Sequence, residues 1–194
     1  MNVLIDLIGS SFIGGILLLL ILKLNLYSQN SGYSSDTELR MQQNAKTLAE
    51  ILNYDLRKVG YNYNSTAILK ADSNRIKFYA DMNEPGTSGY GTMDVVEYFL
   101  SSPSKAAGTT NPNDVVLTRV INGADSSSGP SLGLVRLVFS YFDQKFASTV
   151  IQDSIKYIKT EFWVESLEPI EVNFGTQTRY PFTYWEMTIN PRNI

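Results

Sequence analysis

Few residues of this chain have the types and the spacing that catalysis requires. The sequence contains neither histidine nor cysteine, which excludes imidazole-based triads, thiol nucleophiles and Cys/His zinc sites. Ser102 and Lys105 match the S-x-x-K motif of penicillin-binding enzymes, but they lie in an expected loop without an S-D-N or K-T-G motif elsewhere. No twelve-residue EF-type calcium loop is present. We therefore expect no catalytic residue, no metal, no cofactor and no enzymatic activity.

The most informative titratable residue is Asp6, because it lies in an apolar segment. Residues 3–22 read VLIDLIGSSFIGGILLLLIL and carry no other charge. A helix of this length, about 30 Å, can cross the hydrocarbon core of a bilayer. A carboxylate in hydrocarbon costs roughly 2.5–3.5 kcal/mol on insertion scales, and such residues usually mark function. Asp6 therefore favours a helix that must meet a positive group on a neighbouring subunit.

Two other interpretations of this segment stay open. A cleaved signal peptide would carry basic residues before the apolar run and a small-residue cleavage site after it. Here Lys23 is the first basic residue, and LNLYSQNSGY follows the apolar run. An ordinary single-pass anchor would place Asp6 close enough to the membrane surface to remain hydrated.

The composition describes a folded domain in addition to this helix. The chain has 194 residues, of which 43% are hydrophobic and 12% aromatic, values typical of a globular, β-rich fold. The net charge is −3 and the lysines and arginines form no cluster. These values argue against nucleic acid as the main partner.

A second helical pattern covers residues 37–59. Its apolar residues recur at intervals of three or four, which predicts one buried face of an amphipathic helix: Met41, Ala45, Leu48, Leu52, Leu56 and Val59. We expect this face to pack on a sheet through Leu48, Leu52, Asp55, Leu56, Arg57 and Val59. The serines, asparagines and glycine around Ser31 and Gly32 predict a loosened stretch or kink between the two helical patterns.

From residue 61 onward the pattern is typical of β-strands. Segments rich in β-branched and aromatic residues, separated by turn residues, predict about seven strands at residues 68–70, 75–80, 94–101, 114–121, 132–142, 155–165 and 181–190. Short strands separated by turns favour antiparallel pairing. We therefore predict an α+β fold, in which a long N-terminal helix, apolar in its first half and amphipathic in its second, packs on a mostly antiparallel sheet.

The expected organisation has three parts. Residues 1–28 form an apolar helix that serves as membrane anchor or filament core, residues 29–60 form the amphipathic half of the helix, and residues 61–194 form a β-rich head domain.

Several segments together resemble the type IV pilin-like proteins, specifically the minor-pilin or pseudopilin branch (PilW- and GspJ-like proteins). Residues 3–7, VLIDL, resemble the mature pilin start, with Asp6 where the family has a glutamate. Residues 52–61, LNYDLRKVGY, resemble the family's D-[LIF]-R-x-[AV]-G-[YF] motif. Residues 94–100, 116–122 and 134–143 resemble its VEYFL, LTR and VxFxYFD series, and residues 190–193 resemble its P-R-N ending.

The resemblance implies a subunit that polymerises through its N-terminal helix. Asp6 would pair with the N-terminal amine of the adjacent subunit, so that both charges are neutralised inside a filament. The assembly surface is expected to include Leu4, Ile5, Asp6, Phe12, Gly14 and Gly15. Small residues such as Gly14 and Gly15 permit close approach of helices, although they are also tolerated in membrane helices without such a role.

Two functions are therefore compared. The favoured one is a structural subunit of a pilin-like extracellular filament or pseudopilus, with copies of itself or other pilin-like subunits as partners. Such a subunit would reside in the inner membrane before assembly and in an extracellular or periplasmic filament afterwards. The alternative is a membrane-anchored extracytoplasmic β-domain that serves as a binding or adhesion module.

Overall fold

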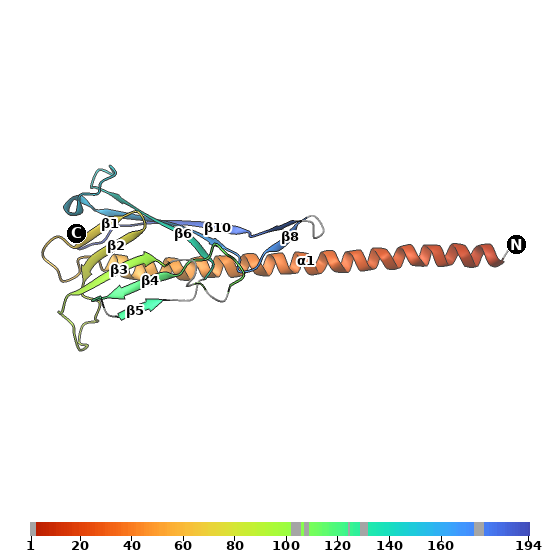
Figure 1. The fold of residues 1–194 in the computed structure, drawn as a ribbon, viewed down its shortest axis with the longest axis horizontal. Helices are drawn as coiled ribbons and strands as arrows, with labels where there is room; N and C mark the ends of the chain where they lie inside the picture. The colour runs from red at the N-terminus through yellow and green to blue at the C-terminus, as the bar shows by residue number, and fades with distance from the viewer. Residues whose placement is uncertain (1–2, 102–105, 107–108, 124, 129–131, 173–176) are drawn as a thin grey trace. The chain divides into compact units, whose positions relative to one another are not determined.

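A computed structural model of the chain describes residues 3–101, 106, 109–123, 125–128, 132–172 and 177–194. Its first element is helix α1, Val3–Arg57, which continues without interruption for 55 residues (Figure 1). The loosened stretch predicted near Ser31 and Gly32 is therefore wrong, because the helix runs through both residues. Serine and glycine cost a helix only about 0.5–1 kcal/mol each relative to alanine. Helical turns that are already formed on both sides propagate through such residues.

The chain divides into two structural units, Met1–Leu39 and Arg40–Ile194. The first unit holds the apolar part of α1. The second unit holds the last turns of α1 and all strands of the described residues. Met41 is the first buried residue of α1, so the division falls where the helix begins to share a core with the strands.

Every strand pair within the described residues is antiparallel. The largest sheet has the order β1-β2-β3-β4-β5, a second sheet has the order β10-β7-β6, and β8 pairs only with β9. A short 3₁₀-helix, η2 (Gln152–Ser154), precedes β7. The strand bounds are β1 (Ile68–Asp72), β2 (Arg75–Ala80), β3 (Asp94–Leu100), β4 (Leu117–Ile121), β5 (Asp125–Ser128), β6 (Leu134–Phe142), β7 (Tyr157–Glu165), β8 (Ile170–Val172), β9 (Gln177–Arg179) and β10 (Phe182–Ile189).

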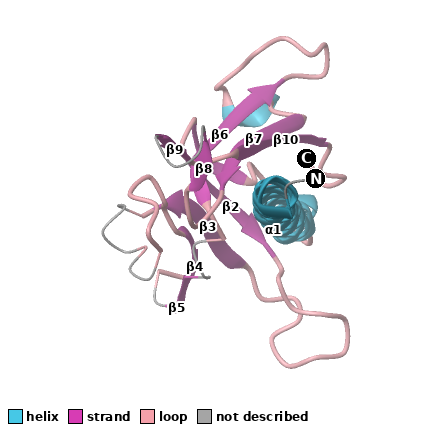
Figure 2. Ribbon diagram, turned by 90° about the vertical axis from the view of Figure 1, so that its right-hand side faces the viewer, coloured by secondary structure: helices cyan, strands magenta, loops and turns pink. Residues whose placement is uncertain are grey.

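The hydrophobic core of the second unit lies between the last turns of α1 and the inner faces of the two larger sheets. Figure 2 shows the strands grouped beside the helix. Along β7, buried and half-buried residues alternate without exception, as expected for a strand with one face on a core. The main contributors are Met41, Ala45, Leu48, Leu52 and Leu56 from the helix, and Ile76, Phe78, Val96, Tyr98, Leu137, Phe139, Ile158 and Phe162 from the strands. The predicted α+β fold, with a long helix packed on antiparallel strands, is confirmed.

The sequence pattern misses three strands. β5 reads DSSS and lies in a segment expected to be a loop, yet it pairs with β4 from Asp125 opposite Ile121 to Ser128 opposite Thr118. This pairing uses backbone groups, which need no apolar alternation. β8 and β9 have three residues each, too few for a period of two to be recognised.

The strand predicted from Asp114 begins only at Leu117. The N–H of Val115 donates to the carbonyl oxygen of Leu134 at 2.7 Å, so this part of the chain joins the start of β6 before it enters the ladder with β3.

Candidate functional site

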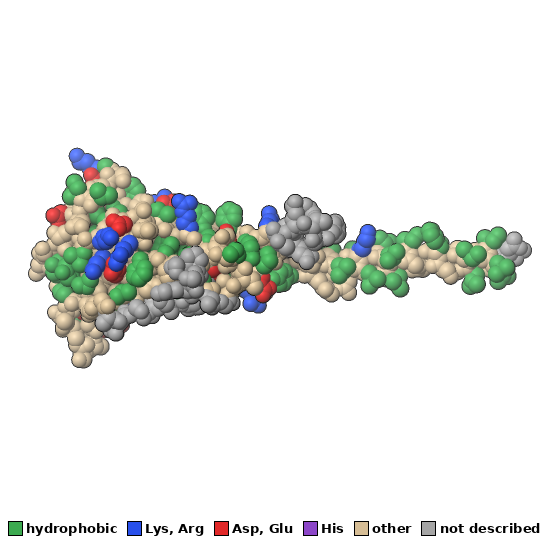
Figure 3. All heavy atoms as spheres, in the orientation of Figure 1, with side chains coloured by type: hydrophobic (Ala, Val, Ile, Leu, Met, Phe, Trp, Pro, Cys, Tyr) green, Lys and Arg blue, Asp and Glu red, His purple; other side chains and the backbone are tan. Residues whose placement is uncertain are grey.

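The apolar part of α1 presents its side chains to the surroundings. The large hydrophobic residues between Val3 and Leu26 are each 44–79% exposed, and the face drawn in Figure 3 shows them along this helix with few charges among them. Among the described residues, α1 is the one helix long and apolar enough, by length and composition, to span a membrane. Such a surface is stable in water only when lipid or another protein covers it.

Asp6 lies in the first turn of α1 and is exposed. The partial positive charge at a helix N-terminus favours a carboxylate at this position. The neighbouring assembly candidates are also on the surface, with Leu4 73%, Ile5 64% and Phe12 70% exposed. The structure thus places Asp6 within an accessible apolar surface, where a cation of a second molecule can reach it.

Gly14 and Gly15 have no structural role within the described chain. A Cβ atom added at either position meets no heavy atom within 4 Å. Each glycine in a helix costs roughly 1 kcal/mol relative to alanine, and no contact among the described residues at these two positions offsets this cost. Both positions therefore leave open space at which a helix of another molecule could approach closely.

The helix–sheet residues lie near the other end of α1. Leu48, Leu52 and Leu56 are buried on the helix, and Val59 is buried just after the helix ends. Arg57 is exposed.

Asp55 is 3% exposed and is the only ionisable side chain among the buried residues of α1. Its Oδ2 accepts the hydroxyl of Tyr98 at 2.5 Å and the Nε of Arg119 at 2.5 Å. Tyr98 and Arg119 are directly opposite each other in the β3–β4 ladder, so one carboxylate joins the helix to two adjacent strands. Burial and the charge of Asp55 raise the pKa of the Tyr98 hydroxyl above its usual range, which keeps it a donor.

Tyr98 and Arg119 were absent from the predicted packing residues. Both lie in segments that resemble the pilin-like series, Tyr98 in VEYFL and Arg119 in LTR. That resemblance was the one feature of the sequence that could have pointed to these two residues. Their partner in space is Asp55 rather than a residue near them in the sequence.

The described residues contain no group of three or more Asp or Glu side chains arranged to hold a metal ion. Ser102 and Lys105, the S-x-x-K candidates, lie outside the described residues.

No family model and no curated protein matches the sequence. Among solved structures, a type IV-like pilin from Thermus thermophilus aligns with a TM-score of 0.49 and 9% sequence identity. The alignment covers 77% of this chain and 96% of that pilin.

Proposed function

We propose that this chain is a pilin-like structural subunit that enters a filament through the apolar part of α1. Its partners would be copies of itself or other pilin-like subunits of the minor-pilin or pseudopilin type. The observation that carries the proposal is the exposed apolar helix surface with Asp6 inside it. The sequence resemblance to pilin-like proteins supports the same function.

Before assembly, this surface would be covered by the inner membrane, with the second unit on the extracytoplasmic side. In a filament, extracellular or periplasmic, the same surface would be covered by the apolar helices of neighbouring subunits. Close packing at Gly14 and Gly15 would bring these helices together. This function is structural and uses no catalytic residue.

Asp6 distinguishes assembly from simple anchoring. In a filament it would neutralise a positive group of the adjacent subunit, which in the resembled family is the N-terminal amine. Loss of one partner of a buried ion pair costs about 3–5 kcal/mol. In an isolated membrane helix the same loss is favourable, because it removes a charge that costs roughly 2.5–3.5 kcal/mol in hydrocarbon. The two functions therefore predict opposite effects of Asp6→Ala.

The test measures membrane content and fibres for the same set of variants. Asp6→Ala is expected to reach the membrane at normal or higher levels, yet to form no fibres by electron microscopy. Asp6→Glu should assemble better than Asp6→Asn, since charge matters more than shape. Ser10→Ala, a neutral change in the same exposed segment, should alter neither measurement, and deletion of residues 1–28 should give a monomeric domain.

Assembly through Asp6 is refuted if Asp6→Ala forms fibres as well as the parent protein, or if Asn serves as well as Glu. Detergent-bound monomers of the unaltered protein, with no fibres under any condition, would favour the membrane-anchored binding module.

A further inference from the structure

Strand β10 is at the edge of its sheet and leaves one side of its backbone unpaired. The sheet order places β7 on one side of β10 only. The N–H of Ser166 donates to the carbonyl oxygen of Pro181, and hydrogen-bonded pairs alternate along an antiparallel ladder. The N–H and C=O groups of every second residue therefore point away from β7: Phe182, Tyr184, Glu186 and Thr188. Within the described residues, these groups have no backbone partner.

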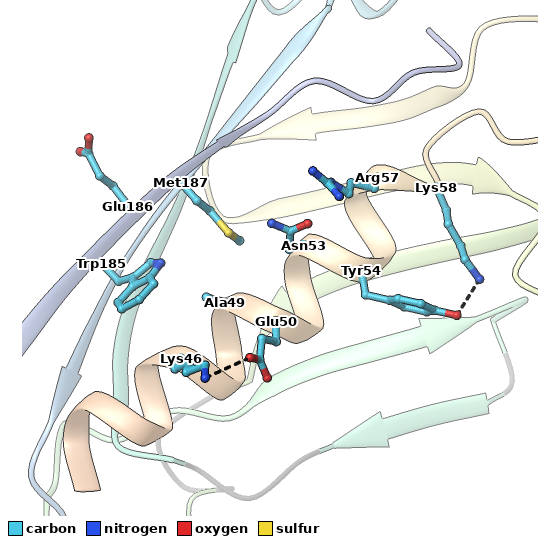
Figure 4. Close-up of a pocket in the computed structure, with 10 residues that line it drawn as sticks. All are labelled: Lys46, Ala49, Glu50, Asn53, Tyr54, Arg57, Lys58, Trp185, Glu186 and Met187. Carbon is cyan, nitrogen blue, oxygen red and sulfur yellow. Dashed lines mark hydrogen bonds and ion pairs between the residues drawn. The ribbon is translucent and has the colours of Figure 1, made fainter. Parts of the chain in front are cut away.

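An open groove of about 760 Å³ borders this free edge. One wall is the exposed face of α1 between Lys46 and Arg57, and the other wall is the middle of β10, with no residue of β7 in the lining. Figure 4 shows the side chains of Trp185 and Met187 directed toward α1, and that of Glu186 directed away from it. Ala49 adds to the apolar lining. The groove lies wholly within Arg40–Ile194.

The groove carries two cations, Arg57 and Lys58, that form no ion pair among the described residues. Its two acidic residues already have partners: Glu50 pairs with Lys46 at 3.7 Å, and Glu186 accepts the Tyr184 hydroxyl at 2.6 Å and pairs with Lys159. Lys58 donates to the Tyr54 hydroxyl and to the carbonyl of Met82, both uncharged groups.

Arg57 lines the groove and also the adjoining hollow of about 400 Å³ beside Pro85. It makes no ion pair among the described residues. Its guanidinium has five donors that suit a carboxylate in two-point contact.

We propose that this groove binds an extended, acidic peptide segment of a partner protein, which pairs as an additional strand with the free edge of β10. Addition of a strand to a sheet edge obtains affinity from backbone hydrogen bonds and specificity from alternate side chains. Apolar side chains of the segment would pack on Trp185 and Met187, and one carboxylate would contact Arg57. A second carboxylate would compete with Glu50 for Lys46, whose pair with Glu50 at 3.7 Å is exposed and therefore weak. The proposal is independent of filament assembly, since no residue of the apolar helix contributes to the groove.

The spacing of Lys46 and Arg57 along α1 sets the length of the peptide segment. From Lys46 to Arg57, α1 rises by about 16 Å. Six residues of an extended strand span about 20 Å. A symmetric peptide with two aspartates six residues apart and valines between them therefore fits in either direction. The probe is acetyl-Thr-Asp-Thr-Val-Thr-Val-Thr-Asp-Thr-amide, and its control carries Asn in place of both Asp residues.

The experiment measures residue-resolved amide hydrogen exchange by NMR on the full-length protein in detergent micelles. Saturating probe peptide is expected to slow exchange of the Tyr184 and Glu186 amides at least tenfold. The Asn peptide should bind roughly tenfold more weakly. Arg57→Ala should remove most of the difference between the two peptides, whereas Arg179→Ala, at an exposed arginine outside the groove, should preserve it.

A backbone test complements the charge test. Thr188→Pro removes one outward N–H from the edge, where proline is tolerated, and should weaken the probe at least fivefold relative to Thr188→Ala. The proposal is overturned if millimolar probe peptide leaves the β10 amides unprotected. It is equally overturned if Arg57→Ala and Arg179→Ala have the same effect, or if Thr188→Pro binds like Thr188→Ala.

Discussion

Removal of the Asp55 carboxylate should destabilise the second unit more than any other single change of a charged residue on α1. In Asp55→Ala, the Arg119 guanidinium and the Tyr98 hydroxyl lose their shared acceptor. Removing one partner of a buried ion pair lowers the free energy of unfolding by about 3–5 kcal/mol. The side chain of Arg119 is 26% exposed and can recover some hydration, which favours the lower end of that range.

The Tyr98 hydroxyl cannot recover its hydrogen bond in the same way, because Tyr98 is 1% exposed. An unsatisfied buried donor costs about 1–3 kcal/mol. We therefore expect Asp55→Ala to lower the free energy of unfolding by about 4 kcal/mol. Asp55→Asn retains an acceptor for Tyr98 and loses only the charge, so a loss of about 2 kcal/mol is expected.

Urea unfolding of the full-length protein in a mild detergent, followed by tryptophan fluorescence, measures these losses. The two tryptophans, Trp163 and Trp185, lie in β7 and β10, so the signal reports the second unit alone. Glu50→Ala is the control: its pair with Lys46 is exposed on both sides, and such pairs contribute about 0.3–0.5 kcal/mol. A loss below about 1 kcal/mol for Asp55→Ala would refute the reasoning, as would Asp55→Asn with unchanged stability.

Two further changes test other buried polar groups. Asp81 is fully buried and accepts the backbone N–H groups of Gly91 and Asn83; burial alone would raise its pKa, but these hydrogen bonds outweigh burial and lower the pKa. Asp81→Asn should therefore lose about 1–3 kcal/mol at pH 7. Its deficit relative to the parent protein should begin to shrink below about pH 3.9, where Asp81 of the unfolded chain protonates, and should be lost as the pH falls through the lower pKa of Asp81 in the folded protein. An equal deficit in urea unfolding at pH 7 and pH 3 would contradict this. Thr160 is fully buried, and its hydroxyl has no hydrogen-bond partner among the described residues, so Thr160→Val should be neutral or stabilising by about 1 kcal/mol in the same assay, whereas a clear loss would show that the hydroxyl is bound.

Periodicity in the sequence was a reliable guide to which helix face is buried. Leu52 and Leu56 follow the spacing of an amphipathic helix and are 1% and 0% exposed. The strands with β-branched and aromatic alternation were found for the same physical reason, since burial of one face imposes the pattern. Where the pattern had no apolar period, as in the serines of β5, the strand was missed.

Contacts that depend on the register of the sheet could not be predicted. Asp55 meets Tyr98 and Arg119 across 43 and 64 residues of sequence, and only the pairing of β3 with β4 brings those two side chains together. The groove beside β10 is formed by segments still farther apart. The long helix itself was predicted, but a loosened stretch near Gly32 was wrongly expected within it, because local propensities there are small compared with the cooperativity of a long helix.

The row of buried side chains on α1 has a mechanical consequence. From Met41 to Leu56 these residues extend over about 22 Å of the helix. Tension along the helix axis must therefore slide all of them past the strands at the same time, in shear, whereas a sideways force would detach them one after another. The ion pair of Asp55 with Arg119 lies near the last turn of α1, at the end of the helix that is farthest from a force applied at the N-terminus. A pull on the N-terminal helix therefore loads all of these core contacts together, and they resist it better than a sideways force that breaks them one by one.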